Sequence, residues 1–217
     1  TVLAMVLLPE NLSQAERYKL LIGAIVPRPI AWVSTVSPSG QPNLAPFSFF
    51  NGVGSNPMLL LFCPANKIDG TEKDSLRNAK PVSEGGQGEI VVNAVPRALC
   101  EAMAACAAEL EYGQSEWDFA KVTSAPSQRV RPARVAESPV AFECVTRQVI
   151  RTNGNAPAAG NIVMGEVVAV WAAEGVVNER LHVDPAVLDA VGRMGGPNGY
   201  ATTRDRFEVK RGEVGGG

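Results

Sequence analysis

The pattern of apolar and polar positions predicts a chain built mainly of short β-strands. Segments that alternate apolar and polar residues, or are rich in β-branched side chains, are bounded by turns that contain glycine and proline. A parallel sheet would need strands that alternate regularly with longer helices, and that pattern is absent. We therefore expect a mainly β protein with short helices, folded as a closed or nearly closed antiparallel barrel. The predicted strands are residues 30–37, 58–63, 89–95, 140–151 and 161–173, and residues 30–63 are expected to form an antiparallel meander.

The same pattern predicts only short helices between these strands. Ser13 is followed three residues later by Glu16, which is a capping box and marks the start of the first helix. A second helix follows a turn and is capped by either Asp74 or Ser75. The predicted helices are residues 14–22, 69–80, 96–110 and 184–192.

Residues 41–51, QPNLAPFSFFN, alternate poorly for a strand and are too aromatic for an ordinary loop. Paired with the strand at 30–37, this segment would bring hydroxyl and amide groups beside its phenylalanines. Such a mixed surface suits a flat ring system with one polar edge. The alternative is that Phe47 and Phe49 fill the barrel, and the residues alone slightly favour it. The glycines that follow, in NGVGSN (51–56), are interpreted as a turn between two strands.

Residues 71–78, TEKDSLRN, place Thr71, Lys73 and Ser75 at or just before the start of a helix. Free backbone N–H groups and the charge of Lys73 would favour an anion at this position. An ordinary surface helix with Asp74 or Ser75 as its cap has the same composition and is the more frequent case. On the residues alone, the structural interpretation is therefore favoured.

Composition and charge argue against several classes of function. The 217 residues include 20 Lys and Arg against 22 Asp and Glu, and this net charge of −2 offers no basic surface for nucleic acid. The four cysteines form no Cys-x-x-Cys pair and His182 is the one histidine, so the sequence supports neither a zinc site nor a Ser-His-Asp system. No apolar run reaches membrane length, and the lack of a disulfide framework favours a cytoplasmic location.

Seven stretches, in order along the chain, resemble the flavin reductase-like, FMN-binding split-barrel family. Each one alone is weak evidence, whereas the ordered set is specific and covers nearly the whole chain. The resemblance implies a single domain over 1–217, a split β-barrel with Greek-key-like connections, in which 1–10 and 203–217 are loose or peripheral. The stretches are PRPIAWVST (27–35), GQPNLAPFSFFNGVGSNP (40–57), EKDSLRN (72–78), VVNAV (91–95), RPARVAESPVAFEC (131–144), GEVVAVW (165–171) and VDPAVLDAVGRMGGPNGYA (183–201).

The resemblance also implies which residues hold the cofactor. The strand and the 45–51 segment would line the flavin ring and ribityl chain, the Lys-Asp-Ser turn would meet the phosphate, and the C-terminal tail would fold over the site. No metal ligand and no catalytic side chain is expected. The expected FMN-binding residues are Ser34, Thr35, Ala45, Phe47, Ser48, Phe49, Asn51, Lys73, Asp74, Ser75, Arg193 and Tyr200.

The activity that the resemblance implies is transfer of hydride from NADH or NADPH to FMN, in a homodimer that supplies reduced flavin to a partner oxygenase. The alternative is an FMN-binding electron carrier without nicotinamide turnover. Neither nucleic acid nor a membrane is an expected partner. In one departure from the family pattern, Gly160 and Asn161 stand where several relatives carry a histidine, so Asn161 either supplies that polar contact or the contact is missing.

Overall fold

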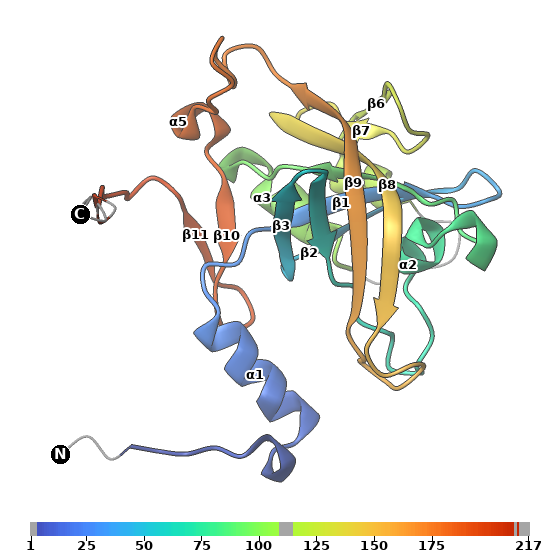
Figure 1. Cartoon of the computed structure of the whole chain (residues 1–217), viewed down its shortest axis with the longest axis vertical. Helices are drawn as coiled ribbons and strands as arrows, with labels where there is room; N and C mark the ends of the chain where they lie inside the picture. The colour runs from blue at the N-terminus through green and yellow to red at the C-terminus, as the bar shows by residue number, and fades with distance from the viewer. Residues whose placement is uncertain (1–3, 109–114, 211, 213–217) are drawn as a thin grey trace, which may run out of the picture.

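The protein is described here by a computed structural model that covers residues 4–108, 115–210 and 212. Its centre is a seven-stranded sheet with the strand order β2-β1-β5-β8-β9-β4-β3, in which all neighbouring strands are antiparallel (Figure 1). These strands are β1 (Ala31–Val36), β2 (Pro42–Phe47), β3 (Phe50–Ser55), β4 (Met58–Phe62), β5 (Glu89–Asn93), β8 (Val140–Arg151) and β9 (Asn161–Ala172).

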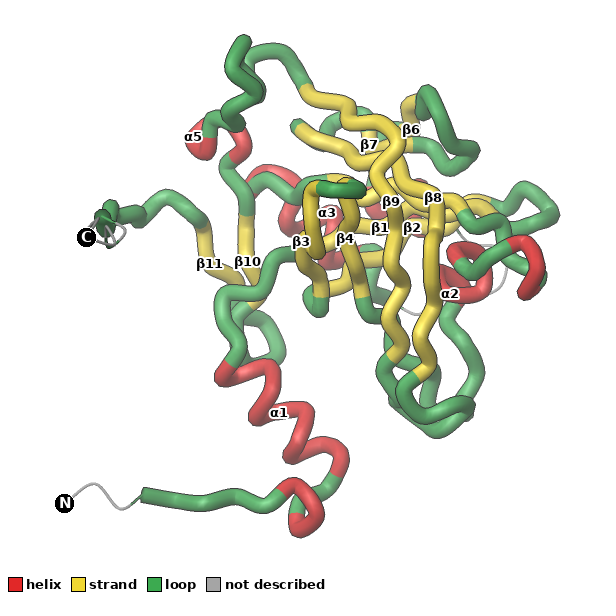
Figure 2. The backbone as a smooth tube through the Cα atoms, viewed as in Figure 1, coloured by secondary structure: helices red, strands yellow, loops and turns green. Residues whose placement is uncertain are grey.

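The remaining elements are short and lie around this sheet (Figure 2). Two further two-stranded sheets pair β6 (Ser124–Ala125) with β7 (Arg134–Val135), and β10 (Val191–Arg193) with β11 (Tyr200–Thr202). The α-helices are α1 (Gln14–Ala24), α2 (Asp74–Ala79), α3 (Cys100–Ala105), α4 (Glu116–Ala120) and α5 (Pro185–Leu188), and the 3₁₀ turns are η1 (Pro9–Asn11), η2 (Val82–Glu84) and η3 (Arg97–Leu99). No helix among the described residues is both long enough and apolar enough to span a membrane.

The chain closes the sheet into a barrel through a very short connection. Strands β2 and β3 are the two opposite edges of the sheet, yet only Ser48 and Phe49 join them. Because two residues span only a few ångströms, the sheet must curl until its edges meet at this corner. The described part of the chain contains no pairing between β2 and β3, so the barrel remains split along this line. We call the Ser48–Phe49 corner and the adjoining strand edges the seam. The expected split β-barrel is confirmed.

Alternation along β1 fills two cores, one on each face of the sheet. Ala31 and Val33 point into the barrel, where Phe47 packs on Phe62 with ring centroids 5.1 Å apart. Trp32 points to the other face and packs there with buried residues of β2, α3 and α4. Burial raises the pKa of the Cys106 thiol to about 11, so it packs as a small apolar group on that face.

Two sequence predictions in this region were wrong. Residues 51–56 were expected to form a turn, but Phe50–Ser55 is strand β3, because its backbone pairs with β4 from Phe50 opposite Phe62 to Ser55 opposite Met58. The predicted meander over residues 30–63 is also interrupted, since β2 and β3 lie at opposite edges of the sheet.

The helix predictions need smaller corrections. The capping box of Ser13 and Glu16 is confirmed, and α1 extends two residues beyond the predicted end. Neither predicted residue caps α2: Lys73 is the N-cap, and Ser75 lies buried inside the helix. Residues 97–99 form a 3₁₀ turn and α3 ends at Ala105, whereas 109–110 lie outside the described residues.

The predicted helix over 184–192 is also too long. Helix α5 ends at Leu188, and the chain then enters strand β10. A Cβ at Gly192 would come within 2.7 Å of Pro27, so glycine permits the close approach of this strand to the start of the barrel.

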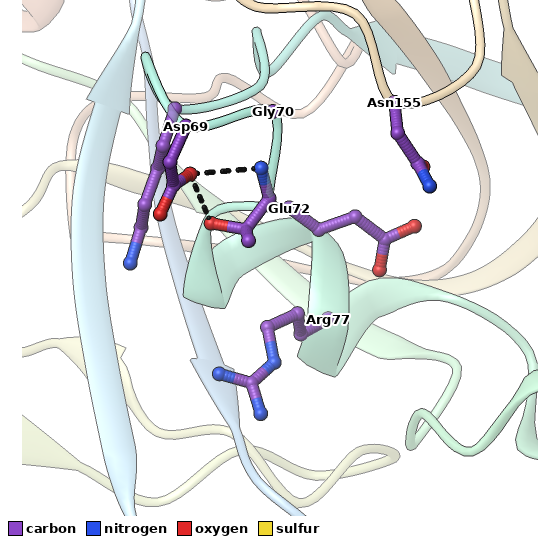
Figure 3. Close-up of a pocket in the computed structure, with 7 residues that line it drawn as sticks. Asp69, Gly70, Glu72, Arg77 and Asn155 are labelled. Atoms are coloured by element: carbon purple, nitrogen blue, oxygen red, sulfur yellow. Dashed lines mark hydrogen bonds between the residues drawn. The ribbon is translucent and has the colours of Figure 1, made fainter.

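The loop before α2 is held against the tip of the β8–β9 hairpin (Figure 3). Asp69 accepts hydrogen bonds from the backbone N–H and the hydroxyl of Thr71, at 2.9 and 2.6 Å. Gly70 has φ +84°, and a Cβ there would lie 2.2 Å from the carbonyl oxygen of Asn155. This position therefore requires glycine for both its conformation and its close contact. The result is a fixed entry into the turn that carries Lys73.

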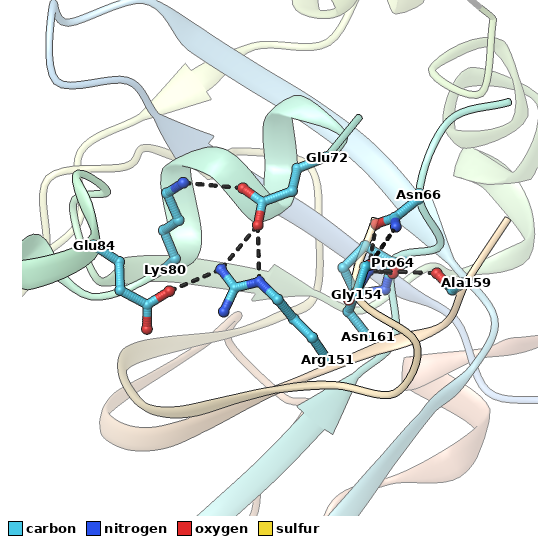
Figure 4. Close-up of polar contacts among 9 residues, drawn as sticks. All are labelled: Pro64, Asn66, Glu72, Lys80, Glu84, Arg151, Gly154, Ala159 and Asn161. Atoms are coloured by element: carbon cyan, nitrogen blue, oxygen red, sulfur yellow. Dashed lines mark hydrogen bonds and ion pairs between the residues drawn. The ribbon is translucent and has the colours of Figure 1, made fainter. Parts of the chain in front are cut away.

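A half-buried ion network fixes the same turn from the other side (Figure 4). The Glu72 carboxylate accepts hydrogen bonds from Lys80 at 3.0 Å and from Arg151 at 2.8 Å, and Arg151 also pairs with Glu84 at 2.7 Å. Burial alone would raise the pKa of Glu72, but the hydrogen bonds from Lys80 and Arg151 outweigh it and hold the pKa below the ordinary value. The network thus joins the turn to strand β8.

We predict that Phe47→Ala lowers the free energy of unfolding by about 3–5 kcal/mol, because it removes a buried ring and leaves a cavity against Phe62. Chemical denaturation of the purified variant measures this loss. Phe119→Ala is the matched control: its side chain is 55% exposed, and we expect a change within about 0.5 kcal/mol. Equal effects of the two changes would show that Phe47 does not pack in the barrel.

We predict that Glu72→Gln destabilises the protein in a pH-dependent way. The folded pKa of Glu72 lies below its ordinary value of 4.5, so its contribution is present above that pH and is lost as the pH falls through the folded pKa. The difference in free energy of unfolding between wild type and variant should therefore be largest near neutral pH and shrink in acid. Glu10→Gln, at an exposed position, should show no such trend. A difference that is constant with pH would contradict the prediction.

Candidate functional site

The seam brings together segments from both ends of the chain. The half-buried Ser48 hydroxyl accepts a hydrogen bond from Arg28 Nε at 3.2 Å, and the Phe49 carbonyl accepts one from the Cys63 N–H at 2.8 Å. Arg28 and Arg193 also exchange backbone hydrogen bonds of 2.9 and 2.8 Å. The corner of the barrel is thus tied both to the segment after α1 and to the β10–β11 hairpin.

Arg28 is the centre of these contacts, although its side chain is almost entirely buried, with 4% exposed. Its guanidinium donates to the carbonyl oxygens of Ile22 and Ile25 at the end of α1, and to that of Met194 at 3.1 Å. Burial lowers the pKa of Arg28, and the carbonyls at the negative end of the α1 dipole offset part of the cost of burying its charge. It forms no ion pair with any carboxylate in the described chain.

Sequence reasoning did not assign a role to Arg28. It stands between two prolines in the stretch PRPIAWVST. The available signal for a role was this charged residue, placed between two prolines that stop a helix and just before a buried strand. Its partners could not be inferred, because Met194 lies 166 positions further along the chain.

A cavity of about 540 Å³ opens between α1, the seam and the loop that follows β10. We call it the seam cavity. It brings Ser48 and Arg193, two of the predicted site residues, to one place, and adds residues that the sequence did not suggest. Its lining includes Tyr18, Lys19, Ile22, Arg28, Ser48 and Arg193.

The predicted pair in the tail lies together beside this cavity. The guanidinium of Arg193 stacks over the Tyr200 ring, 4.6 Å from its centroid, across the β10–β11 pair. Arg193 also donates to the carbonyl oxygens of Gly199 and Pro197, at 2.8 and 2.5 Å. The loop between the two strands is therefore folded around the arginine.

The predicted hydroxyls at the opposite end of β2 are engaged inside the protein. Ser34 donates to the Ala133 carbonyl at 2.5 Å. The Asn43 amide donates to the hydroxyl of Thr35 at 3.2 Å and to that of Ser75 at 3.0 Å. Ser34, Thr35 and Ser75 are each at most 2% exposed. Asn43 thereby fixes α2 to the edge strand β2.

The remaining predicted residues are more accessible. Lys73 is exposed, and the exposed Asp74 pairs with Arg77 at 3.2 Å. Beside them lies a second cavity of about 520 Å³, lined by residues that include Lys67, Thr71, Glu72 and Asn155 (Figure 3). Ala45 and Phe49 are half-buried, Phe47 is buried, and Asn51 is exposed, with its amide oxygen accepting from the Gly52 N–H.

These two groups of residues sit at opposite ends of one edge strand. Asn43 contacts Ser75 of α2, and Ser48 contacts Arg28. Ser48 follows Asn43 by five positions, which at roughly 3.3 Å per residue is a separation of roughly 16 Å. Along this length the outer edge of β2 has no paired strand in the described chain.

Asn161, which was considered above as a substitute for a polar contact of the family pattern, has a structural role. It is 1% exposed, and its amide donates to the Pro64 carbonyl at 3.0 Å and to Asn66 at 2.8 Å (Figure 4). This holds the loop before α2 in place and leaves the side chain unable to reach a ligand. Among the described residues, no three His, Cys, Asp or Glu side chains gather in a group that could hold a metal ion.

Comparisons with known proteins agree on one family. A model of the flavin reductase like domain matches residues 23–194. An uncharacterized protein of Deinococcus radiodurans is 42% identical, over 92% of this chain and 86% of its own length. The structure of nitrilotriacetate monooxygenase component B from Bacillus cereus is similar with a TM-score of 0.87 and 32% identity, over 96% of this chain and 100% of that one.

A second solved structure is that of 2-nitrobenzoate 2-nitroreductase NbaA from Pseudomonas fluorescens. It is similar with a TM-score of 0.83 and 28% identity, over 97% of this chain and 98% of that one. Both neighbours share the fold over essentially their whole length. The chain belongs to the flavin reductase-like domain family.

Proposed function

We propose that this protein binds FMN along the free edge of β2 and reduces it with NADH or NADPH. The observation that carries the proposal is the placement of two cationic groups at the ends of this edge, Lys73 near one end and Arg28 with Arg193 near the other. Asn43 and Ser48, which mark the two ends of this edge, are roughly 16 Å apart along the strand, a length comparable with an extended flavin mononucleotide. The family match over residues 23–194 supports the same cofactor class.

The residues present fit such a cofactor. Exposed Lys73 would hold the phosphate, and the half-buried Ala45, Ser48 and Phe49 would face the ring system. When bound, FMN supplies the capacity to accept a hydride and pass electrons on. The chain itself would bind and orient the cofactor and exclude water from it. Its single histidine, His182, is exposed and lies far along the chain from these residues.

The position of the phosphate contact can be tested by removing one charge. We predict that Lys73→Ala raises the dissociation constant of FMN about 10–100-fold, the loss expected for a charge-assisted hydrogen bond. Quenching of flavin fluorescence on titration measures it. Lys210→Ala removes an exposed charge from the tail and serves as the control. If both variants bind FMN as the wild type does, Lys73 is not the phosphate contact.

The reductase activity has its own test. Anaerobic stopped-flow mixing of the FMN-loaded protein with NADH or NADPH should bleach the flavin absorbance rapidly with at least one of the two. FMN that binds but is reduced by neither would assign the protein as an electron carrier instead. The absence of FMN binding would overturn the proposed function altogether.

We also propose a homodimer and a partner oxygenase. The oxygenase is supported by the similarity to a component of a monooxygenase. The dimer is supported by α1, which extends away from the barrel and buries none of its residues in the described chain (Figure 1). A helix of 11 residues is marginal in water without packing. Tyr18, Leu20 and Leu21 present apolar surface that a second copy would cover.

The role of α1 in the dimer gives a direct prediction. Leu21→Asp places a charge on the exposed apolar surface of the helix and should shift the protein from dimer to monomer in analytical ultracentrifugation. Val82→Asp is the control, because Val82 is also exposed, at 70%, but lies in η2 and not in α1. A wild-type protein that sediments as a monomer would contradict the dimer.

A further inference from the structure

Strand β3 is a sheet edge without the features that usually protect one. It pairs with β4 on one side, and no strand pairs with its other side in the described chain. Every residue from Asn51 to Ser55 is exposed. The sequence of the strand, FNGVGS, contains neither a proline nor a charged residue. An exposed and uncharged edge of this kind readily accepts a further strand.

The opposite edge of the sheet, β2, is protected against the same event. It carries Pro42 and Pro46, and proline has no N–H that could donate to a further strand. Residues an even number of positions apart direct their backbone groups to the same side of a strand, so both prolines remove a donor from the outer edge. Strand addition is therefore disfavoured at β2 and open at β3.

The open edge of β3 offers both a donor and apolar contact. The Gly52 N–H donates to the side-chain oxygen of its neighbour Asn51 at 2.9 Å, a local bond that the carbonyl of a docking strand would replace. The pairing with β4 shifts register around Val53, whose side chain is 47% exposed. Met58, opposite Ser55 in β4, is 45% exposed. A docking segment with apolar side chains would cover both.

The same chain contains an extended apolar segment that lacks a partner. Residues 4–8, AMVLL, precede η1 and form neither helix nor strand; we call them the arm. All five residues are exposed, and Met5 and Val6 are 79% and 84% exposed. No backbone N–H of residues 5–7 forms a hydrogen bond within the described chain. The arm thus has what β3 lacks, namely free backbone groups and uncharged apolar side chains.

The arm of a chain lies away from its own β3. Arg28 binds the carbonyl oxygens of Ile22 and Ile25, which fixes the end of α1 to the barrel. A helix of 11 residues is roughly 16 Å long, and the arm precedes its far end and leads away from the barrel (Figure 1). A second copy is therefore the source of an arm for β3. The arm also continues into α1, the helix that supports the proposed dimer.

We propose that the arm of each copy adds to the outer edge of β3 in the other copy and extends the sheet by one strand. The five residues of the arm match the length of β3, which has six. Main-chain hydrogen bonds would hold the arm, and its side chains would contact Val53 and Met58. The exchange is reciprocal, as two-fold symmetry requires. This inference rests on the homodimer proposed above and is independent of FMN binding.

Amide hydrogen exchange of the full-length protein tests this, at concentrations above and below the dissociation constant of the dimer. We expect the amides of residues 52–55 to exchange about tenfold or more slowly in the dimer. Val6→Asp and Leu7→Asp place a charge on opposite faces of the arm, and at least one should remove this protection. Val82→Asp, at another exposed position, is the control and should leave it unchanged. Thermal melting confirms that the variants are folded.

A cross-link identifies the copy from which the arm comes. Chains with Val6→Cys and chains with Val53→Cys, one of them carrying an affinity tag, are mixed and treated with a short bismaleimide. We expect a covalent heterodimer from this pair and none from Val6→Cys mixed with Val82→Cys. Wild-type protein corrects for the four native cysteines, of which Cys63 is half-buried and the other three are buried.

The outcomes separate this inference from the proposed homodimer. A dimer in which residues 52–55 are unprotected, or in which neither arm variant removes their protection, overturns the inference and leaves the dimer standing. A cross-link that forms only within single chains of the double variant Val6→Cys/Val53→Cys also overturns it, because the arm would then lie on its own barrel. A wild-type monomer at every concentration overturns both, whatever the result with FMN.

Discussion

The two-residue corner at Ser48 and Phe49 is the constraint on which the rest of the structure depends. It joins strands that lie at opposite edges of a seven-stranded sheet, so the sheet has to close. Closure buries Phe47 against Phe62 and gives the barrel its interior core. It also leaves β2 and β3 unpaired with each other in the described chain, so β2 keeps an outer edge along which no strand pairs with it.

Arg28 connects that corner to α1 and to the loop after β10. Its buried guanidinium holds the end of α1, the loop after β10 and the Ser48 hydroxyl in one arrangement. At the other end of β2, Asn43 performs the corresponding task by binding Thr35 and Ser75, and the ion network of Glu72 holds the turn from outside. The edge strand is therefore rigidly supported at each end, which is what precise placement of a long cofactor requires.

Local patterns were predictable from the sequence, and long-range consequences were not. Strands β8 and β9 follow twelve-residue alternations and were predicted almost to the residue, as was the Ser13–Glu16 cap. Strand β3 was missed because Asn51, Gly52 and Gly54 favour a turn locally, and only pairing with β4 makes them a strand. The role of Arg28 depends in part on Met194, and that of Asn161 on Asn66, both distant in sequence, so the local pattern alone did not reveal these roles.

The central claim is that FMN lies along the free edge of β2 between the Lys73 turn and the seam. Backbone amide chemical shifts, followed by NMR as FMN is added, test it most directly. The account predicts that the largest changes fall in residues 45–52 and 71–76, with little change in α5 or in the middle of β8. Saturable binding with the largest changes elsewhere, and none in those two segments, would contradict it.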